Sequence, residues 1–481
     1  MYKNIKVVNV GYLILIVLGV LLVFSTVFSG KNRGDGTQYL SENDLSCEGC
    51  NVLVIGFDAL QANHVSHLGY KKITTPTLDT LASNGVSFSR NFSVASWTVP
   101  SFMSYFTSLY PSEHGVVNKF VTFTENEKVI SNLKKISPQV LTLADAFKSA
   151  GYITGGFTGD AGVNSIFGYG QGFDTYTDET TFGSIEGSAS HALSWLDEHQ
   201  GEKFFMFLHG YDAHGQFSGV GPDYKPTFAH GADEQYEITP ERQRELREKG
   251  LSDGDLLLDK GEVSAWNAWY DSKIFDADAR IGVFLSELEK RNLLESLVVV
   301  VISDHGTEIY EHRRFDHGYS LYNELIRVPL VISVPNQENS FISDVQVRSI
   351  DLAPTLFDIT GITINDDWKN QIRGSSLVPV LTGEEKNNRP VFSSTDYRNY
   401  THKRSYIDDG SWKLIYTLET GESELYNLKD DLSEYKDLAT IFPDRVENMK
   451  NILFEQLLRT GENVDGKWEI GCLPVYNDQC I

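Results

Sequence analysis

Two acidic positions follow apolar runs that have the character of buried strands. Asp58 comes directly after Val52–Phe57, and Asp304 with His305 comes directly after Leu297–Ser303. Polar residues just beyond the carboxyl ends of parallel strands commonly form ligand sites. Carboxylate and imidazole groups suit a divalent cation such as Mn, Zn, Ca or Mg. One aspartate at a strand end is as often only a helix cap, but two such strand ends together predict a metal site.

Thr98 is a candidate nucleophile, because its hydroxyl lies at the expected start of a helix. An apolar helical stretch runs from there through Leu109, with Pro100 in its first turn, as is usual for a helix start. The N–H groups and the dipole at a helix N-terminus favour negative charge. A hydroxyl held there against a divalent metal ionises more readily and becomes a nucleophile. The simpler interpretation of this segment alone is that Thr98 is an N-cap.

Histidines recur at the expected strand ends. His209 and His214 follow another apolar run, and His317 lies in a Phe-Asp-His-Gly segment. Such histidines can donate hydrogen bonds to anionic ester oxygens or protonate a leaving group. A single one is more often structural, so the prediction depends on their recurrence. Lys119 could add positive charge to this site, although a solvent-facing role explains it equally well.

Alternating strand and helix patterns predict an α/β fold, with a mainly parallel sheet sandwiched by helices. Buried strands are expected at Val52–Phe57, Phe204–Leu208, Leu297–Ser303 and Pro329–Val334. Helical patterns lie between and after them, at Thr75–Ala82, Leu141–Ala150, Asp271–Leu288 and Asp351–Thr360. We expect this catalytic domain to span residues 51–390.

Two regions depart from this alternation. The charged, weakly periodic segment at about 215–261 is expected to be an insertion over the sheet edge that shapes access to the site. Residues 391–481 are expected to form a small C-terminal subdomain with an antiparallel sheet. Its short alternating runs are separated by Asp-Gly and Thr-Gly turns and precede one helix, at Arg404–Asp408, Trp412–Thr417, Ser423–Tyr426 and Phe442–Leu458.

The N-terminus predicts a membrane anchor. Residues 7–30 contain no charged side chain, and Lys3 and Lys6 precede them. Such a stretch can cross the bilayer as a helix, and the positive-inside rule puts residues 1–6 in the cytoplasm. The rest of the chain would then lie outside the cell membrane, after a polar stalk at 31–50. A cleaved signal peptide is the alternative, and it also exports the chain.

The charge balance of the chain limits the classes of molecule that it is expected to bind. Lys and Arg total 41 against 66 Asp and Glu, a formal charge of -25, which disfavours nucleic acid. An anionic substrate would need local positive charge, such as a metal ion.

In an oxidising compartment the four cysteines favour disulfides over a zinc site, with local and end-to-end pairing both open. They are Cys47, Cys50, Cys472 and Cys480.

The order of these segments resembles the sulfatases, within the alkaline phosphatase superfamily. The similarity extends from Asn51 to about residue 460, and the order of its segments is more specific than any one of them. The tail resembles the family's C-terminal subdomain at Gly410–Ile415 and Glu424–Leu428. The main matching stretches are Asn51–Asp58, Thr75–Ala82, Thr98–Ser101, Thr107–Gly115, His209–His214, Ser303–Gly306, Leu321–Pro329 and Asp351–Asp358.

Departures from the family pattern bear on the chemistry that the resemblance implies. Sulfatases convert a Cys or Ser to formylglycine in a Cys/Ser-x-Pro-x-Arg motif, whereas this chain has Thr98 and Phe102. Threonine cannot be oxidised to that aldehyde. Superfamily members with an unmodified Thr are phosphotransferases and phosphodiesterases, such as lipoteichoic-acid synthases and phosphoethanolamine transferases. Ala59 replaces a second aspartate, which implies a single metal held by Asp58, Thr98, Asp304 and His305.

The resemblance therefore implies a metal-dependent enzyme that cleaves or transfers phosphate (or sulfate) esters through Thr98. His214 and His317 would act as catalytic groups, and His209 and Lys119 would bind substrate. The substrate would be an anionic ester, as a small molecule, lipid headgroup or envelope polymer. One alternative is a true sulfuric ester hydrolase. Another is an inactive sulfatase-like surface binding protein, which has no need for the full set of metal ligands and nucleophile.

Overall fold

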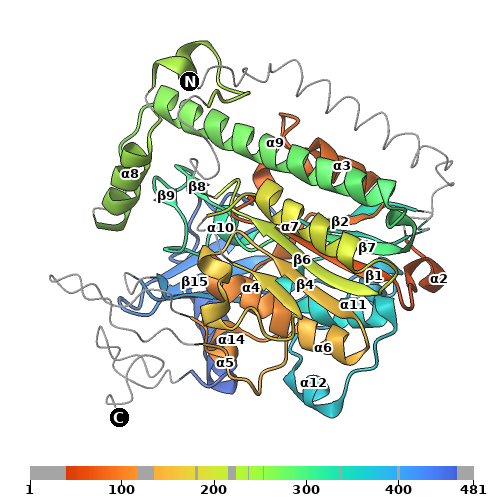
Figure 1. Ribbon diagram of the computed structural model, residues 1–481. Helices are drawn as coiled ribbons and strands as arrows, with labels where there is room; N and C mark the ends of the chain where they lie inside the picture. Colours follow the sequence, from red (N-terminus) through yellow and green to blue (C-terminus); the bar gives the residue numbers. More distant parts are fainter. Residues whose placement is uncertain are drawn as a thin grey trace, which may run out of the picture.

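A computed structural model describes residues 39–117, 135–178, 182–214, 224–236, 238–252, 254–335, 337, 339–397 and 401–462. Its main sheet lies between two layers of helices (Figure 1). The sheet has eight strands, in the order β11 (Phe341–Ser343), β2 (Val86–Phe88), β10 (Leu330–Ser333), β7 (Leu297–Ser303), β1 (Asn51–Phe57), β6 (Phe204–Gly210), β4 (Ile153–Phe157) and β5 (Thr175–Thr177).

The predicted mainly parallel sheet is confirmed, with one strand reversed. β1 pairs in parallel with both β6 and β7, and β4 continues the parallel arrangement beyond β6. β10, predicted at Pro329–Val334, runs antiparallel to β7 and to β2. An apolar run indicates a buried strand but not its direction, because both directions bury the same side chains.

β1 lies in the middle of the sheet and is buried on both faces. Val52 and Val54 point into one hydrophobic core, and Leu53 and Ile55 point into another. Alternation along a strand sends successive side chains to opposite faces, so a strand covered on both sides must be apolar throughout. This requirement explains the unbroken apolar run that precedes Asp58.

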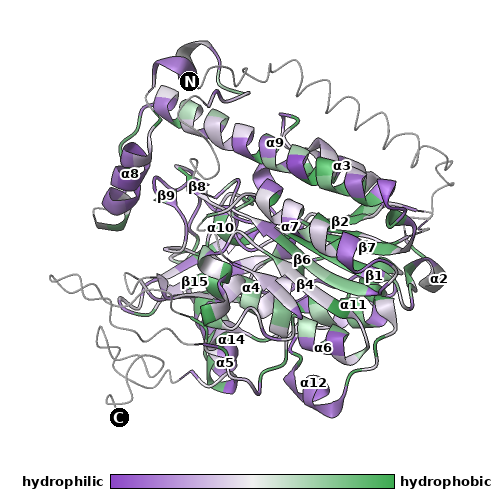
Figure 2. Cartoon of the chain, viewed as in Figure 1, coloured by the Kyte–Doolittle hydropathy of each residue, from purple (hydrophilic) through white to green (hydrophobic). Residues whose placement is uncertain are grey.

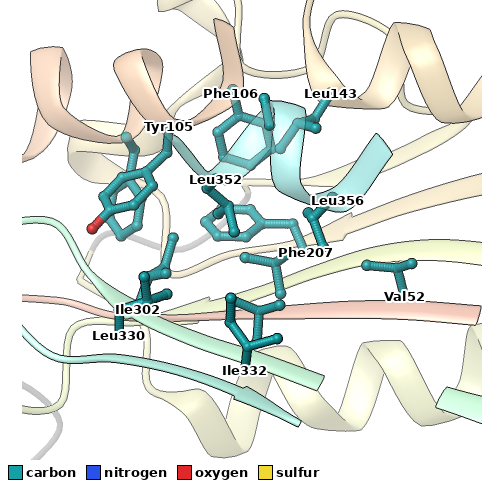
Figure 3. Close-up of a cluster of buried hydrophobic side chains, with 14 of the residues drawn as sticks. Val52, Tyr105, Phe106, Leu143, Phe207, Ile302, Leu330, Ile332, Leu352 and Leu356 are labelled. Carbon is teal, nitrogen blue, oxygen red and sulfur yellow. The ribbon is translucent and has the colours of Figure 1, made fainter. Parts of the chain in front are cut away.

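Helices cover each face of the sheet. On one face lie α4 (Thr98–Thr107), α6 (Leu143–Ser149) and α11 (Leu352–Thr360). Figure 3 shows Phe106 of α4, Leu143 of α6 and Leu356 of α11 gathered over Phe207 of β6. The other face is covered by α3 (Pro76–Ser83), α7 (Ile185–Glu198) and α9 (Lys260–Lys290).

The expected insertion contains a polar helix, α8 (Pro240–Ser252). Figure 2 shows α8 as almost entirely hydrophilic, in contrast to the apolar central strands. The long helix that follows begins at Lys260 rather than at Asp271 as predicted. Its N-cap is Asp259, whose carboxylate accepts the N–H groups of Gly261 and Glu262. This capping starts the helix three turns before Asp271.

A second, four-stranded antiparallel sheet follows, as predicted. It consists of β13 (Val391–Thr395), β14 (Lys403–Ile407), β15 (Trp412–Thr417) and β16 (Ser423–Asn427), and α14 (Pro443–Arg459) packs on it. The N–H of Ser394 in β13 donates to the carbonyl of Val94, so this sheet is joined directly to the segment that leads into Thr98.

Shorter elements are α2 (Glu42–Leu45), α5 (Pro111–His114), α10 (Asn323–Ile326), α12 (Asp366–Gln371), α13 (Val378–Leu381), and the strand pairs β3 (Asn91–Phe92) with β12 (Val347–Arg348) and β8 (Glu308–Ile309) with β9 (Phe315–Asp316).

The described part of the expected stalk packs against the domain. Leu40 and Leu45 are buried in the core under α11, which a solvated stalk would not require. A disulfide joins Cys47 to Cys50, so these two cysteines pair locally. Cys472, Cys480 and the expected anchor at residues 7–30 lie outside the described residues. Within the described ranges, no helix combines the length and apolar character needed to span a bilayer.

Candidate active site

Three side chains with metal-ligand atoms meet at the ends of two neighbouring strands. Asp58 follows β1, and Asp304 and His305 follow β7; one ligand atom from each lies within 4.8 Å of the others. The parallel register pairs Phe57 with Ser303, which puts the next residue of each strand at the same level. All three are fully buried. Two buried carboxylates this close repel each other unless a cation or a proton compensates them.

Asp304 is oriented by three hydrogen bonds that it accepts. Its Oδ1 accepts the N–H of Ala59 at 3.0 Å and the N–H of His305 at 2.9 Å. Its backbone carbonyl accepts the hydroxyl of Ser101 on α4 at 2.6 Å, and the Ser101 hydroxyl also pairs with that of Ser93. Its Oδ2 is buried and accepts no hydrogen bond from any residue that the structure describes. A bound cation would satisfy this oxygen.

His305 is held in the tautomer that binds metals. Its Nδ1 lies 2.6 Å from the carbonyl oxygen of Gly306, which can only accept, so Nδ1 carries the proton. Burial lowers the pKa of His305, and the neutral ring then presents a lone pair on Nε2. That atom lies 3.3 Å from Asp304 Oδ2 and 3.3 Å from Thr98 Oγ1. Metal-bound histidines characteristically show this arrangement, so the residues fit a divalent cation.

Thr98 is the first residue of α4 and is 5% exposed. The N-cap is Trp97, with no side-chain capping bond, so the interpretation of Thr98 as an N-cap is wrong. Its hydroxyl instead contacts His305. Gly162 lies against its other side, since a Cβ added to Gly162 would come 2.7 Å from Thr98 Cγ2. The hydroxyl is therefore fixed beside the metal-ligand group, at a helix N-terminus that favours negative charge.

His209 does not occupy the substrate-binding position that we expected from the sequence. It has no exposed surface, and its Nε2 lies 3.3 Å from Asp58 Oδ2. The ring of Phe102, at the position of the motif arginine, packs edge-on to it with centroids 5.1 Å apart. Burial lowers the pKa of His209 to about 4. It lies behind Asp58 and orients that carboxylate.

His214 and His317 are brought together with the other site residues. Their ring centroids are 5.0 Å apart, and the ring of His317 lies 4.3 Å from that of His305. His317 Nδ1 is 2.5 Å from Oδ1 of Asp316. Burial alone would raise the pKa of Asp316, but His317 and the neighbouring Arg247 hold it well below its usual range.

Several residues at the site gave no clear signal in the sequence. The ring of Phe182 stacks on His214 at 5.4 Å, and Tyr397 lies 5.5 Å from Trp97 and 5.9 Å from His317. These rings come from segments without strand-end patterns. Lys119, the proposed source of positive charge, lies outside the described residues.

A second group with metal-ligand atoms consists of Glu308, His312 and Glu324. Both ring nitrogens of His312 are taken by protein acceptors, Glu324 Oε1 at 2.6 Å and the carbonyl of Glu434 at 3.1 Å. Glu308 accepts hydrogen bonds from two backbone N–H groups and from the hydroxyl of Tyr319. This group is a structural network rather than a second metal site.

Comparison with known families agrees with this geometry. The family model described as sulfatase matches residues 50–362. The chain belongs to the sulfatase family. A model described as the C-terminal part of N-sulphoglucosamine sulphohydrolase matches residues 310–462, which include the second sheet. Membership confirms the resemblance drawn from the ordered segments, and with it the alkaline phosphatase superfamily.

Individual sulfatase relatives match over shorter stretches. Mouse arylsulfatase K is 27% identical over 195 residues, 38% of this chain and 34% of the relative. N-acetylglucosamine-6-O-sulfatase of Bacteroides thetaiotaomicron is 32% identical over 170 residues, 35% of this chain and 28% of the relative. The match thus spans about a third of the length of these curated relatives.

Solved structures resemble the fold over most of the chain. A 2-O GAG sulfatase superposes with a TM-score of 0.67 and 20% identity, covering 85% of this chain and 92% of that one. The phosphonate monoester hydrolase of Agrobacterium radiobacter gives 0.64 and 19%, covering 85% and 96%. The same fold therefore carries enzymes named for two different ester classes.

Proposed function

We propose that this sulfatase-family protein is a metal-dependent enzyme that cleaves phosphate esters with Thr98 as its nucleophile. The observation that carries the proposal is the 3.3 Å approach of Thr98 Oγ1 to His305 Nε2, beside the buried carboxylates of Asp58 and Asp304. A hydroxyl enclosed in this way has no capping role and lies within reach of a shared cation. Family membership supports hydrolysis of esters as the general reaction class.

Asp58, Asp304 and His305 would hold the cation, with Thr98 Oγ1 as a further ligand. When bound, a divalent cation supplies Lewis-acid polarisation of the ester and makes ionisation of a coordinated hydroxyl easier. His305 presents Nε2 because Gly306 fixes its tautomer. The Ser101 hydroxyl holds α4 on the end of β7 and so keeps Thr98 near Asp304.

The chain's own groups then carry a double displacement. Thr98 Oγ1 gives its proton to solvent, and the resulting alkoxide attacks phosphorus while the bond from phosphorus to the leaving oxygen breaks. His317 donates a proton from Nε2 to that oxygen, because its Nδ1 is engaged by Asp316. Water or an acceptor alcohol then attacks the phospho-threonine and gives up its proton to His317, and Thr98 is released.

Phosphate esters are preferred over sulfate esters because of the nucleophile. Threonine cannot become the formylglycine that sulfatases of the usual type employ, whereas a threonine alkoxide is a competent nucleophile at phosphorus. A true sulfuric ester hydrolase is the second candidate. It is favoured by relatives named as sulfatases, and by a solved structure of similar fold in complex with its substrate D-glucosamine-2-N,6-O-disulfate. The proposal also includes anchoring by residues 7–30, with the catalytic domain outside the cytoplasm.

The test compares wild type, Thr98→Ala and Thr98→Ser, with Thr107→Ala from the far end of α4 as the control. Each is assayed with 4-nitrophenyl phosphate, bis(4-nitrophenyl) phosphate and 4-nitrophenyl sulfate, with EDTA or with Mn, Zn, Ca or Mg added. We expect metal-dependent phosphoester cleavage that falls at least about 10³-fold in Thr98→Ala and persists in part in Thr98→Ser. Activity retained in Thr98→Ala would reject the nucleophile, and faster sulfate turnover would favour the second candidate.

A further inference from the structure

The helix of the insertion, α8, packs on the hairpin that carries His317. Leu246 of α8 is buried in the same core cluster as Phe315 of β9. The segment after α8 continues the contact, since the N–H of Leu256 donates to the carbonyl of Arg313 at 2.7 Å. At its other end α8 is tied to α9 by a two-bond pair between Arg242 and Glu262. The insertion is thus fixed to the edge of the active site.

Arg247 is the residue through which α8 reaches the site. It follows the buried Leu246, and its Nη1 lies 3.5 Å from Oδ2 of Asp316. The other edge of its guanidinium donates from Nε and Nη2 to Glu248 Oε1, at 3.3 and 3.2 Å. The guanidinium therefore turns one edge toward Asp316.

Asp316 connects this cation to the active-site histidine. Its Oδ1 is 2.5 Å from His317 Nδ1, while its Oδ2 is the oxygen that faces Arg247. Asp316 has a φ of +87° and the following Gly318 has +90°, so the backbone on both sides of His317 is in the left-handed region. A non-glycine residue there costs free energy that the surroundings must supply. The ion pair with Arg247 is a stabilising contact of this kind.

We propose that Arg247 is a positioning residue of the active site: it holds Asp316, which in turn orients His317 toward the leaving group. The insertion therefore completes the catalytic machinery of the α/β domain. This inference rests on the proposed function for the role of His317 as the proton donor, but the Arg247–Asp316 contact itself does not. A carboxylate that fixes a histidine's tautomer and orientation is an established device in catalysis.

The leaving-group dependence tests this inference. The full chain is assayed as wild type, Arg247→Gln and Arg247→Lys, with Arg244→Gln as the matched control from an exposed position of α8. The substrates are aryl phosphates from 2,4-dinitrophenyl to 4-methoxyphenyl phosphate, or the aryl sulfates if the wild type prefers them. A misdirected proton donor matters most for a poor leaving group.

We expect Arg247→Gln to lower kcat/KM about 10- to 100-fold for the 4-methoxyphenyl ester but less than about 3-fold for the 2,4-dinitrophenyl ester. Arg247→Lys should recover part of the loss, and Arg244→Gln should match wild type. An equal loss across the series, or no loss, would overturn the inference.

Amide hydrogen exchange of the segment 308–319 gives a readout that needs no turnover. We expect faster exchange in Arg247→Gln than in wild type or Arg244→Gln, because the hairpin loses its ion pair to α8. Unchanged exchange would count against the positioning role. If the wild type cleaves no ester, the proposed function fails, and the exchange result alone decides whether Arg247 holds Asp316.

Discussion

Asp304 accepts the backbone N–H of Ala59, 245 residues earlier in the chain, in a hydrogen bond of 3.0 Å. Ala59 has a φ of +58°, and this bond helps to hold the chain in that turn directly after Asp58. One oxygen of the Asp304 carboxylate thus fixes the ends of β1 and β7 relative to each other, and the other oxygen faces Asp58 and His305. One oxygen of this side chain thus makes structural contacts, and the other is the candidate metal ligand.

The different roles of the two Asp304 oxygens predict that Asp304→Asn keeps its stability without metal but loses metal binding. The amide oxygen can still accept the N–H of Ala59, while one of two repelling carboxylates is removed. Without metal, the variant should be at least as stable as wild type. We expect Mn or Zn to raise the Tm of wild type, and this rise should be lost in the variant, along with activity. Thermal unfolding with EDTA and with added metal checks both, and a variant that keeps its metal-induced shift would contradict the ligand assignment.

Substitution of Gly162 by Ala should separate nucleophile placement from metal binding. The new Cβ would meet Thr98 Cγ2 at 2.7 Å and the hydroxyl of Tyr211 at 2.9 Å, so the Thr98 side chain must move. A displacement of about 1 Å costs about 10²-fold in kcat/KM, whereas metal affinity by calorimetry should fall much less, because Asp58, Asp304 and His305 stay in place. Gly187→Ala on α7 is the control, because its added Cβ meets nothing nearer than 3.9 Å. Full activity in Gly162→Ala would show that Thr98 tolerates displacement.

Restoring the family's motif arginine as Phe102→Arg should fail. Phe102 is fully buried and packs against Phe207 and His209, so a guanidinium there would be a buried charge against aromatic rings. An unpaired buried charge should lower the free energy of unfolding by more than about 4 kcal/mol. Phe102→Leu should cost only about 1–2 kcal/mol. Urea unfolding measures both, and equal stability of the two variants would refute the argument.

The pair of His312 and Glu324 predicts a decline in stability at alkaline pH. Burial alone would lower the pKa of His312, but the carboxylate of Glu324 and the carbonyl of Glu434 raise it to about 9. The folded pKa lies above the unfolded value of about 6.5. The contribution is therefore complete below about pH 6.5 and is lost as pH rises through 9.

The measurement is urea unfolding between pH 6 and 9.5 for wild type and His312→Gln. We expect the wild type to lose on the order of 2–3 kcal/mol over this range from His312, and the variant to lack that part of the slope. His191→Gln, at an exposed position of α7, is the control and should follow wild type. The same slope in all three proteins would mean that other groups titrate.

The grouping of the candidate metal ligands was predictable because its signals are local in sequence. Asp58 and Asp304 each follow an apolar run that can only be a buried strand, and parallel strands bring such ends together. His209 shows the limit of the same signal. It also stands at a strand end, but its direction depends on packing against Phe102, which the sequence pattern does not contain.

The contacts around His317 could not be predicted. The bond between neighbouring Asp316 and His317 forms where Asp316 has a positive φ, which an ordinary residue adopts only when tertiary contacts impose it. Arg247 belongs to a helix without an apolar stripe, so the sequence does not indicate which face of that helix is buried. The direction of β10 was likewise hidden, because a strand buried on both faces is apolar in either orientation.

The central place of β1 has a consequence for how the protein is made. β1 leaves the ribosome early, yet one of its two neighbours, β7, ends about 245 residues later, as the separation of Ala59 and Asp304 shows. At about 5–20 residues per second, this interval is roughly 12 to 50 s. During that time an apolar strand has an unpaired edge that other chains can join. A holding chaperone during synthesis would protect this segment.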